Sequence, residues 1–324
     1  MTGYQWTQRP SMPFTGRDGP GLIAGKFGGS TEELWLYGGW NSDALDEFPT
    51  KTCNQIIRCD NIITGAWSMR RKFGQFLPRH CFGVVEDFSG ALNIYGSDSQ
   101  AGRYISDHWA SGNRIDFKLE GDACPWGPRI LGIPCRFGDD ILMIGGQTLP
   151  AYVGPGTKLI AYTDIWKWQR NNADQGPWRQ ASTDCPALPR GMVDKAVEFQ
   201  GELWLFTGGI YGPPHTYDTK VWKTVGRNLK NWIEVPTIGE KWCARGYANV
   251  AAWDGKLWVV GGYSEATGNL GDTWFSDDGA RWHKLAQPIP PRHAAGLVVY
   301  QDKLTLVAGN GAPMKNDVWQ LARA

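Results

Sequence analysis

Short apolar runs recur six times along the chain, and each run ends at a glycine. In the clearest copy, residues 246–253 and 256–260 are apolar segments of strand length, joined by Asp254-Gly255. An Asp-Gly pair favours a tight hairpin turn, because both central residues of that turn need positive φ. The second segment of each copy is almost continuously apolar, which predicts a strand buried on both faces. These second segments are residues 34–39, 92–96, 141–146, 203–209, 257–262 and 304–309.

An arginine precedes each apolar run, and the arginines mark the length of the repeat. They are Arg17, Arg79, Arg129, Arg190, Arg245 and Arg292, at steps of 62, 50, 61, 55 and 47 residues. A period of about fifty residues is typical of a repeat fold. Each copy reads as four short strands, and no helix of ordinary length is predicted. The chain is therefore expected to be all-β.

Large aromatic residues occupy two fixed places in most copies. A tryptophan, often preceded by Asp-x, follows the apolar run on the predicted third strand, and a second ring stands on the fourth strand. The first set is Trp109, Trp166, Trp222, Trp274 and Trp319, and the second is Trp67, Phe117, Trp178, Trp232 and Trp282. Such rings suit the wedge-shaped gaps between radially arranged sheets, so most of the 18 tryptophans are expected to be structural.

The spacing indicates that the repeats close into a ring. From Arg292 through the C-terminus and on to Arg17, the wrap-around step is 49 residues, which lies within the range of the other steps. The sixth copy lacks a late aromatic residue after Trp319, and Trp6 stands where that residue would fall in a closed ring. We therefore predict that an N-terminal strand completes the last sheet, which also removes two free sheet edges.

The Pro-Arg pairs, Gly-Gly pairs and spaced tryptophans resemble the Kelch-repeat family over essentially the whole chain. The residues that carry the resemblance are Pro78-Arg79, Pro128-Arg129, Pro189-Arg190, Pro291-Arg292, Gly145-Gly146, Gly208-Gly209, Gly261-Gly262, and Trp222 with Trp232. Copy one departs from the pattern, with Ile56-Ile57 in place of the third-strand tryptophan. The resemblance implies a six-bladed β-propeller of Kelch-like four-stranded blades. It implies a single domain over residues 1–324, with blades at approximately 16–70, 77–121, 127–182, 188–236, 244–286, and 291–324 plus 1–10.

Charge and hydropathy narrow the choice of partners. Charged side chains make up 20% of the 324 residues, the net charge is +1, and no run of five like charges occurs. Bulk electrostatics therefore predict no nucleic-acid partner. No apolar stretch approaches the ~18 residues of a membrane span, so no insertion into a membrane is expected.

The seven cysteines bear on location and on metal binding. Their odd number, irregular spacing and lack of a Cys-x-x-Cys pair are typical of reduced thiols. Since residues 1–6 are no signal peptide, we expect a cytoplasmic protein, with a secreted or virion-associated protein as the alternative. No Cys/His cluster has zinc-site spacing, and we find neither the copper set of the copper-oxidase propellers nor the iron motif of plant specifier proteins. No metal and no cofactor is predicted.

Residues that follow the arginines and the glycine-rich ends are expected to meet on one face of the ring. The first two strands of a blade are antiparallel, so the start of one and the end of the next lie together around the axial channel. Asp18, His80 and His293 each follow an arginine and belong to consecutive blades of the ring. With Asp98 they are the candidate acid/base residues. The alternatives are that they hold an anion, bind a divalent metal, or only cap strand ends.

Two further sets of residues are candidates for ligand binding on this face. Arg17, Arg79, Arg129, Arg190, Arg245 and Arg292 either bind a carboxylate, phosphate or acidic peptide, or belong to the scaffold and bond strand-end carbonyls. In Kelch domains of ubiquitin-ligase adaptors, which the chain resembles, arginines on this face contact acidic peptides. The second set comes from strand ends and from loops at residues 41–52, 147–161 and 211–217. Its members are Trp40, Gln147, Tyr211, His215, Tyr263 and Asn310.

Three functions fit these residues. The first is a binding propeller that recognises a small molecule, glycan or acidic peptide, anionic or polar in nature, at the channel mouth. The second is an isomerase similar to the bacterial six-bladed Kelch proteins that interconvert anomers of sialic acid, a mutarotase or epimerase with acid/base residues at the mouth. The third is a glycan-binding adhesin of a virion or cell surface. The fold alone does not choose among them.

Overall fold

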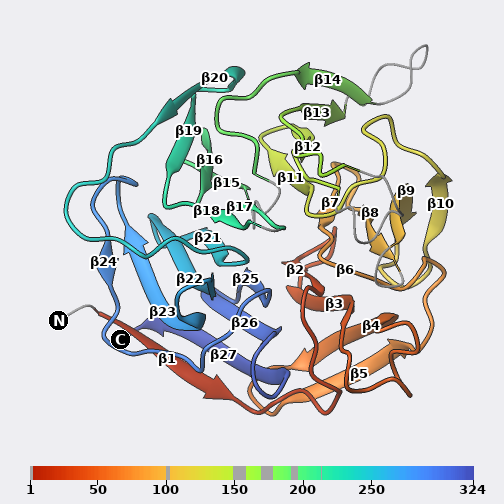
Figure 1. The fold of residues 1–324 in the computed structure, drawn as a ribbon. Coiled ribbons are helices and arrows are strands. Elements are labelled where there is room, and N and C mark those ends of the chain that lie inside the picture. The colour runs from red at the N-terminus through yellow and green to blue at the C-terminus, as the bar shows by residue number, and fades with distance from the viewer. Residues whose placement is uncertain (1–2, 100–102, 149–157, 169–177, 191–195, 213) are drawn as a thin grey trace.

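Antiparallel sheets stand in a ring around a central axis (Figure 1). The computed structural model describes residues 3–99, 103–148, 158–168, 178–190, 196–212 and 214–324, and every regular element within them is a strand. Six of the sheets are blades, and one further sheet is a short ribbon of β17 (Gly209–Ile210) and β18 (Thr216–Tyr217). The predicted six-bladed β-propeller is confirmed.

The blades are numbered along the chain, and their strands are given from the axis outward. Blade one holds β2 (Gly21–Gly25), β3 (Glu33–Trp40), β4 (Thr52–Asn61) and β5 (Ala66–Arg71). Blade two holds β6 (Arg79–His80) and β7 (Val84–Glu86), which both pair with β8 (Leu92–Ser99), then β9 (Arg103–Ser111) and β10 (Lys118–Gly121). Blade three holds β11 (Ile133–Phe137), β12 (Asp140–Ile144), β13 (Ile165–Trp168) and β14 (Trp178–Ser182).

The second half of the ring follows the same order. Blade four holds β15 (Ala196–Phe199), β16 (Glu202–Phe206), β19 (Val221–Val225) and β20 (Asn228–Glu234). Blade five holds β21 (Asn249–Trp253), β22 (Lys256–Ser264), β23 (Gly268–Ser276) and β24 (His283–Lys284). Blade six holds β25 (Gly296–Tyr300), β26 (Lys303–Gly309), β27 (Lys315–Arg323) and, outermost, β1 (Tyr4–Arg9).

The predicted hairpin between the first two strands of blade five is present. Asp254 and Gly255 have φ values of 52° and 65°, as a type I′ turn requires. The turn holds the two strands in a register in which Trp253 faces Lys256 and Asn249 faces Val260. The N-terminal end of β21 therefore lies beside the glycine-rich C-terminal end of β22.

The innermost strands close the ring. β2, β7, β11, β15, β21 and β25 each contact the next strand in this order, and β25 contacts β2. The axial channel is therefore walled by the first strand of every blade.

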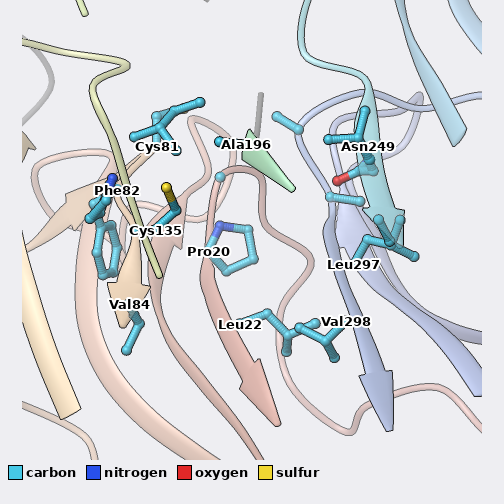
Figure 2. A pocket seen from close by; sticks show the side chains of 18 of the residues that line it. Pro20, Leu22, Cys81, Phe82, Val84, Cys135, Ala196, Asn249, Leu297 and Val298 are labelled. Carbon is cyan, nitrogen blue, oxygen red and sulfur yellow. The ribbon is translucent and has the colours of Figure 1, made fainter. Parts of the chain in front are cut away.

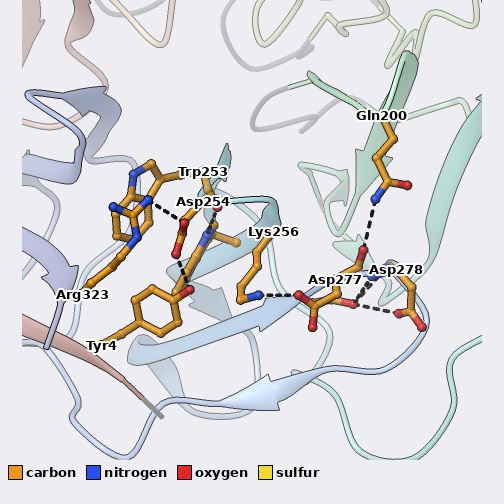
Figure 3. A network of polar contacts seen from close by, with 11 residues as sticks. Tyr4, Gln200, Trp253, Asp254, Lys256, Asp277, Asp278 and Arg323 are labelled. Carbon is orange, nitrogen blue, oxygen red and sulfur yellow. Dashed lines mark hydrogen bonds and ion pairs between the residues drawn. The ribbon is translucent and has the colours of Figure 1, made fainter.

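The N-terminal strand completes the last blade, as predicted. β1 pairs antiparallel with β27, with Trp6 opposite Leu321. The buried Trp6 indole donates a hydrogen bond of 3.0 Å to the Thr273 hydroxyl in blade five. Figure 3 shows that the Tyr4 hydroxyl donates to Asp254, at 2.5 Å. Head and tail of the chain thus share one sheet, and its outermost strand is bonded to the preceding blade.

Tryptophans fill the spaces between blades. Twelve of the 18 tryptophans are buried, so packing is the main role of this residue type. Trp242 and Trp282 meet edge to face, with 4.3 Å between ring centroids, and Trp126 and Trp178 do so at 4.4 Å. Such pairs contribute about 0.5–1.5 kcal/mol each beyond their buried area.

Each blade contains a buried arginine that joins the strands of that blade near the glycine-rich end of the second strand. In blade two, Nη1 of Arg79 donates to the Gly96 carbonyl at 3.0 Å, and both Nη atoms donate to the Asp107 carboxylate at 2.8 Å. We call this arrangement of arginine, strand-end carbonyl and third-strand carboxylate the arginine clamp. It recurs as Arg129 with Asp164, Arg190 with Asp218, Arg245 with Asp272, and Arg292 with Asp317.

Blade one has an incomplete arginine clamp. Nη1 of Arg17 donates to the Gly38 carbonyl at 3.1 Å, but Gln55 stands two residues before Ile57, where most other clamps have aspartate. Among the described residues, Nη2 of Arg17 and Oε1 of Gln55 have no hydrogen-bond partner, although both side chains are buried. Burial lowers the pKa of Arg17. The guanidinium is therefore a buried charge without a carboxylate bonded to it, which is costly.

Gln55→Asp is expected to raise the free energy of unfolding by about 1–3 kcal/mol, because the new carboxylate completes the arginine clamp of blade one. Urea unfolding at neutral pH measures the change. Gln55→Asn is the matched control, since it has the size of aspartate without the charge and is expected not to stabilise. Equal effects of the two substitutions would contradict the role given to the missing charge.

Candidate functional site

Residues next to the arginine clamps form pairs at the channel end of the blades. In five blades, the residue after the clamp arginine lies opposite a residue at the glycine-rich end of the second strand. These pairs are Asp18 with Trp40, His80 with Asp98, Ile130 with Gln147, Gly246 with Tyr263, and His293 with Asn310. The predicted convergence of these positions on one face of the ring is therefore present.

In the same five blades, the second residue after the clamp arginine turns the chain into the first strand. Gly19, Cys81, Leu131, Tyr247 and Ala294 have φ values of 51°, 52°, 61°, 52° and 48°, and we call these five residues the belt. Backbone hydrogen bonds join them between blades, from Ala294 to Tyr247, from Gly19 to Ala294 and from Cys81 to Gly19, at 3.0, 2.7 and 2.8 Å. The belt thus fixes blades five, six, one and two relative to one another around the channel.

Above the belt lies a cavity of about 410 Å³, which we call the mouth cavity. This volume is in the range of small-molecule sites. Nine of the predicted residues line it: Asp18, Trp40, His80, Asp98, Tyr211, His215, Tyr263, His293 and Asn310. The residues that the sequence placed apart by up to 292 positions are therefore neighbours around one hollow.

Hydrogen-bonding groups occupy the side of the mouth cavity formed by blades six, one and two. The Asn310 amide donates to Oδ2 of Asp18 at 2.8 Å, and Nδ1 of His80 lies 3.4 Å from Oδ2 of Asp98. Nδ1 of His293 lies 2.6 Å from Oδ1 of Asn269, which can only accept. His293 therefore carries its proton on Nδ1, and Nε2 is the acceptor of the neutral ring.

Burial favours the uncharged forms of the carboxyl and imidazole groups on this side of the cavity. It raises the pKa of Asp18 to about 7, an effect that the nearby Asp98 adds to and the Asn310 hydrogen bond opposes. It lowers the pKa of His80 and of His293 to about 4. Near pH 7 both imidazoles are uncharged, and Asp18 exchanges its proton in that range.

A series of aromatic rings also lines the mouth cavity. Neighbouring rings touch in one continuous series, with centroid distances between 5.0 and 5.8 Å. The series runs Tyr217, His215, Tyr211, Tyr247, His293 and Tyr263. We call it the aromatic wall. A ligand in the cavity meets aromatic rings together with carboxyl, imidazole and amide groups.

The six clamp arginines do not line the mouth cavity, which corrects one of the two roles considered for them. Arg17, Arg79, Arg129, Arg190, Arg245 and Arg292 are each at most 3% exposed. Their guanidinium groups bond the strand-end carbonyls of their own blades, which agrees with the scaffold role. No described residue of the cavity lining is an arginine or lysine. The electrostatic reason to expect an anionic ligand therefore falls away.

Gln147 is also placed behind the cavity rather than in its lining. It is fully buried, and its amide bonds the backbone of Tyr211, accepting from the Tyr211 N–H at 2.9 Å and donating to the Tyr211 carbonyl. Gln147 thus holds a member of the aromatic wall in place. Of the predicted loops around this face, residues 149–157 and 213 lie outside the described residues.

Several lining residues were not predicted. Tyr247 and Ala294 stand two residues after a clamp arginine, one position beyond the candidates that the repeat marked. Tyr217 lies in the predicted loop at residues 211–217 but was not among the candidates named from it, and Glu265, in the segment after β22, lies 3.5 Å from His215. The one sequence signal for Tyr247 is its position two residues after a clamp arginine, where the chain turns toward the channel.

In the described part of the chain, no group of three or more His, Cys, Asp or Glu residues is placed to hold a metal ion. The described residues also contain no helix with the length and apolar character needed to span a membrane.

These features define a six-bladed β-propeller with a ligand-sized cavity at one end of its channel. No protein-family model and no curated protein matches the chain. Among solved structures, it is similar to one described as "Structure of YjhT", with a TM-score of 0.69 and 13% identity. The match covers 96% of this chain and 95% of that one. At this identity the similarity shows the fold alone.

Asp18→Asn is expected to stabilise the protein more at pH 8 than at pH 4.5. The Asp18 pKa of about 7 in the folded state lies above its ordinary value of 3.8, so the folded state binds the extra proton between these values. Wild-type stability therefore falls as pH rises through this window, and asparagine removes that loss, up to about 4 kcal/mol. Urea unfolding at both pH values measures the difference. An offset that is the same at both would contradict the raised pKa.

Proposed function

We propose that this protein is a Kelch-type binding propeller that takes a small, uncharged polar ligand of the carbohydrate class in the mouth cavity. A sugar ring presents an apolar C–H face and a rim of hydroxyl groups. The aromatic wall suits the face, and Asp18, His80, Asp98 and Asn310 suit the hydroxyls. The presence of both aromatic rings and carboxyl, imidazole and amide groups around one cavity is the observation that carries the proposal.

Charge favours a neutral sugar over an acidic ligand. The described lining offers the carboxyl groups of Asp18, Asp98 and Glu265 and no arginine or lysine. The low pKa values of His80 and His293, about 4, leave both rings uncharged near pH 7. An acidic peptide would meet no arginine or lysine in the described lining, so that partner is the least supported of those considered. A glycan-binding adhesin would use the same cavity chemistry.

Neutral methyl glycosides are expected to bind in the mouth cavity and N-acetylneuraminic acid to bind more weakly. Trp40→Ala and Tyr263→Ala each remove a ring from the cavity and should weaken glycoside binding about tenfold, about 1.4 kcal/mol. Isothermal titration calorimetry at pH 7 measures both comparisons. Phe73→Ala is the control, since Phe73 is 69% exposed and does not line the cavity.

Two results would remove this proposal. One is binding of the acidic sugar alone, which the charges of the lining oppose. The other is glycoside binding that Trp40→Ala and Tyr263→Ala leave unchanged, because the ligand would then occupy another surface.

A second candidate function is acid/base catalysis on the bound sugar, and the position of Asp18 favours it. Exchange of anomers requires a proton on the ring oxygen and removal of one from the anomeric hydroxyl. A carboxyl group with a pKa of about 7 can donate and accept near neutral pH, and His80 with Asp98 belongs to the adjacent blade.

If the protein catalyses this exchange, Asp18→Asn should lower the rate about 10²–10⁴-fold while glycoside binding persists. NMR exchange between the anomer signals of a reducing sugar measures the rate. A rate for the wild-type protein equal to that of buffer alone would leave binding as the function.

A further inference from the structure

A second cavity lies in the axial channel on the other side of the belt. Its volume is about 390 Å³, and the first strands of the six blades supply its walls (Figure 2). It shares only Cys81, Tyr247 and Ala294 with the mouth cavity, and all three belong to the belt. We call it the channel cavity. Its volume is within the range of small-molecule sites.

Most of the described side chains that line the channel cavity are apolar, and they carry no charge. No Asp, Glu, Lys, Arg or His is among these residues. The side chains that surround the hollow include Leu22, Val84, Ile133, Pro134, Val197, Ala252, Leu297 and Val298. Burial raises the pKa of Cys135 to about 12, so this thiol is also uncharged near pH 7. An ion would be poorly solvated here, whereas an apolar molecule would displace water from apolar surface.

Asn249 is the exception in this lining. Figure 2 shows its side chain projecting from β21 toward the cavity. It is 3% exposed, and its Nδ2 has no hydrogen-bond partner among the described residues. A buried amide donor without a partner costs about 1–3 kcal/mol. A ligand that brings an acceptor to this atom recovers that cost.

The fold does not require an amide at this position. Asn249 faces Val260, one residue before the glycine-rich end of the second strand. The residues at the same register in blades one, three and six are Gly21, Ile133 and Gly296. Because glycine and isoleucine occupy this position in other blades, the propeller geometry does not require a polar residue there. The amide of blade five is an addition to the repeat that faces an otherwise apolar hollow.

We propose that the channel cavity is a second binding site, for an uncharged, largely apolar small molecule with one hydrogen-bond acceptor, which the Asn249 amide binds. A ketone, ester or ether on a compact hydrocarbon frame has this chemistry. The site is separate from the one proposed for the sugar, since among the described residues the two cavities share three belt residues and only the mouth cavity is lined by carboxyl and imidazole groups.

The test compares two probes of the same shape, 1-indanone and indane, which differ in one carbonyl oxygen. Equilibrium dialysis with the full chain measures both dissociation constants. The wild-type protein is expected to bind 1-indanone about tenfold more tightly than indane, as one buried hydrogen bond allows. Asn249→Leu keeps the approximate size without the donor and should reduce the ratio to about one by weakening 1-indanone alone.

Two further variants locate the binding. Ala252→Leu fills part of the channel cavity and should weaken both probes, and it keeps the test decisive if Asn249→Leu does not fold. Trp40→Ala alters only the mouth cavity and should leave both probes unchanged. The proposal is overturned if neither probe binds the wild-type protein at millimolar concentration, if the two bind equally, or if Trp40→Ala abolishes binding.

Discussion

The arginine clamp is the interaction on which the rest of the molecule depends. Burying a guanidinium is costly unless its donors are satisfied, and in blade two the donors of Arg79 are satisfied by Leu77, Gly96 and Asp107. One side chain thereby fixes the ends of three strands at a single point. Burial raises the pKa of Asp272, but its bonds to Arg245 hold that pKa below its ordinary value. The carboxylate therefore stays charged, and the clamp stays intact, well into the acidic range.

The clamp also determines where a functional side chain can stand. In five blades the residue after the arginine lies opposite the glycine-rich end of the second strand, and in four of them it lines the mouth cavity. Ring closure then brings blades six, one and two together, with His293, Asp18 and His80 on consecutive blades. The seam made by β1 lies at the outer edge of blade six, far along the sheet from these residues. Ring closure and the mouth cavity thus use opposite edges of the same blade.

The repeat made the fold predictable, because the apolar runs, the turns and the large aromatic residues all recur with the same spacing. The role of Trp6 followed from spacing alone, and the structure places it in the last blade. Side-chain direction was less accessible. The pattern showed both the arginines and the Asp-x-Trp motifs, but only the structure shows that Asp107 and its equivalents receive the guanidinium groups. Gln147 lies behind the cavity for a similar reason: an amide can serve backbone or ligand, and spacing does not tell which.

The distribution of residues around the mouth argues that its polar side has a role beyond folding. At the position after the arginine, blades three and five have Ile130 and Gly246, so the clamp needs neither an acid nor an imidazole there. Asp18 nevertheless occupies it in blade one, where burial raises its pKa to about 7. Ionising this carboxyl group therefore lowers stability at higher pH. A repeat that tolerates isoleucine and glycine has no packing reason to keep so costly a group, and protein sites that break the local rules in this way are where chemistry is expected.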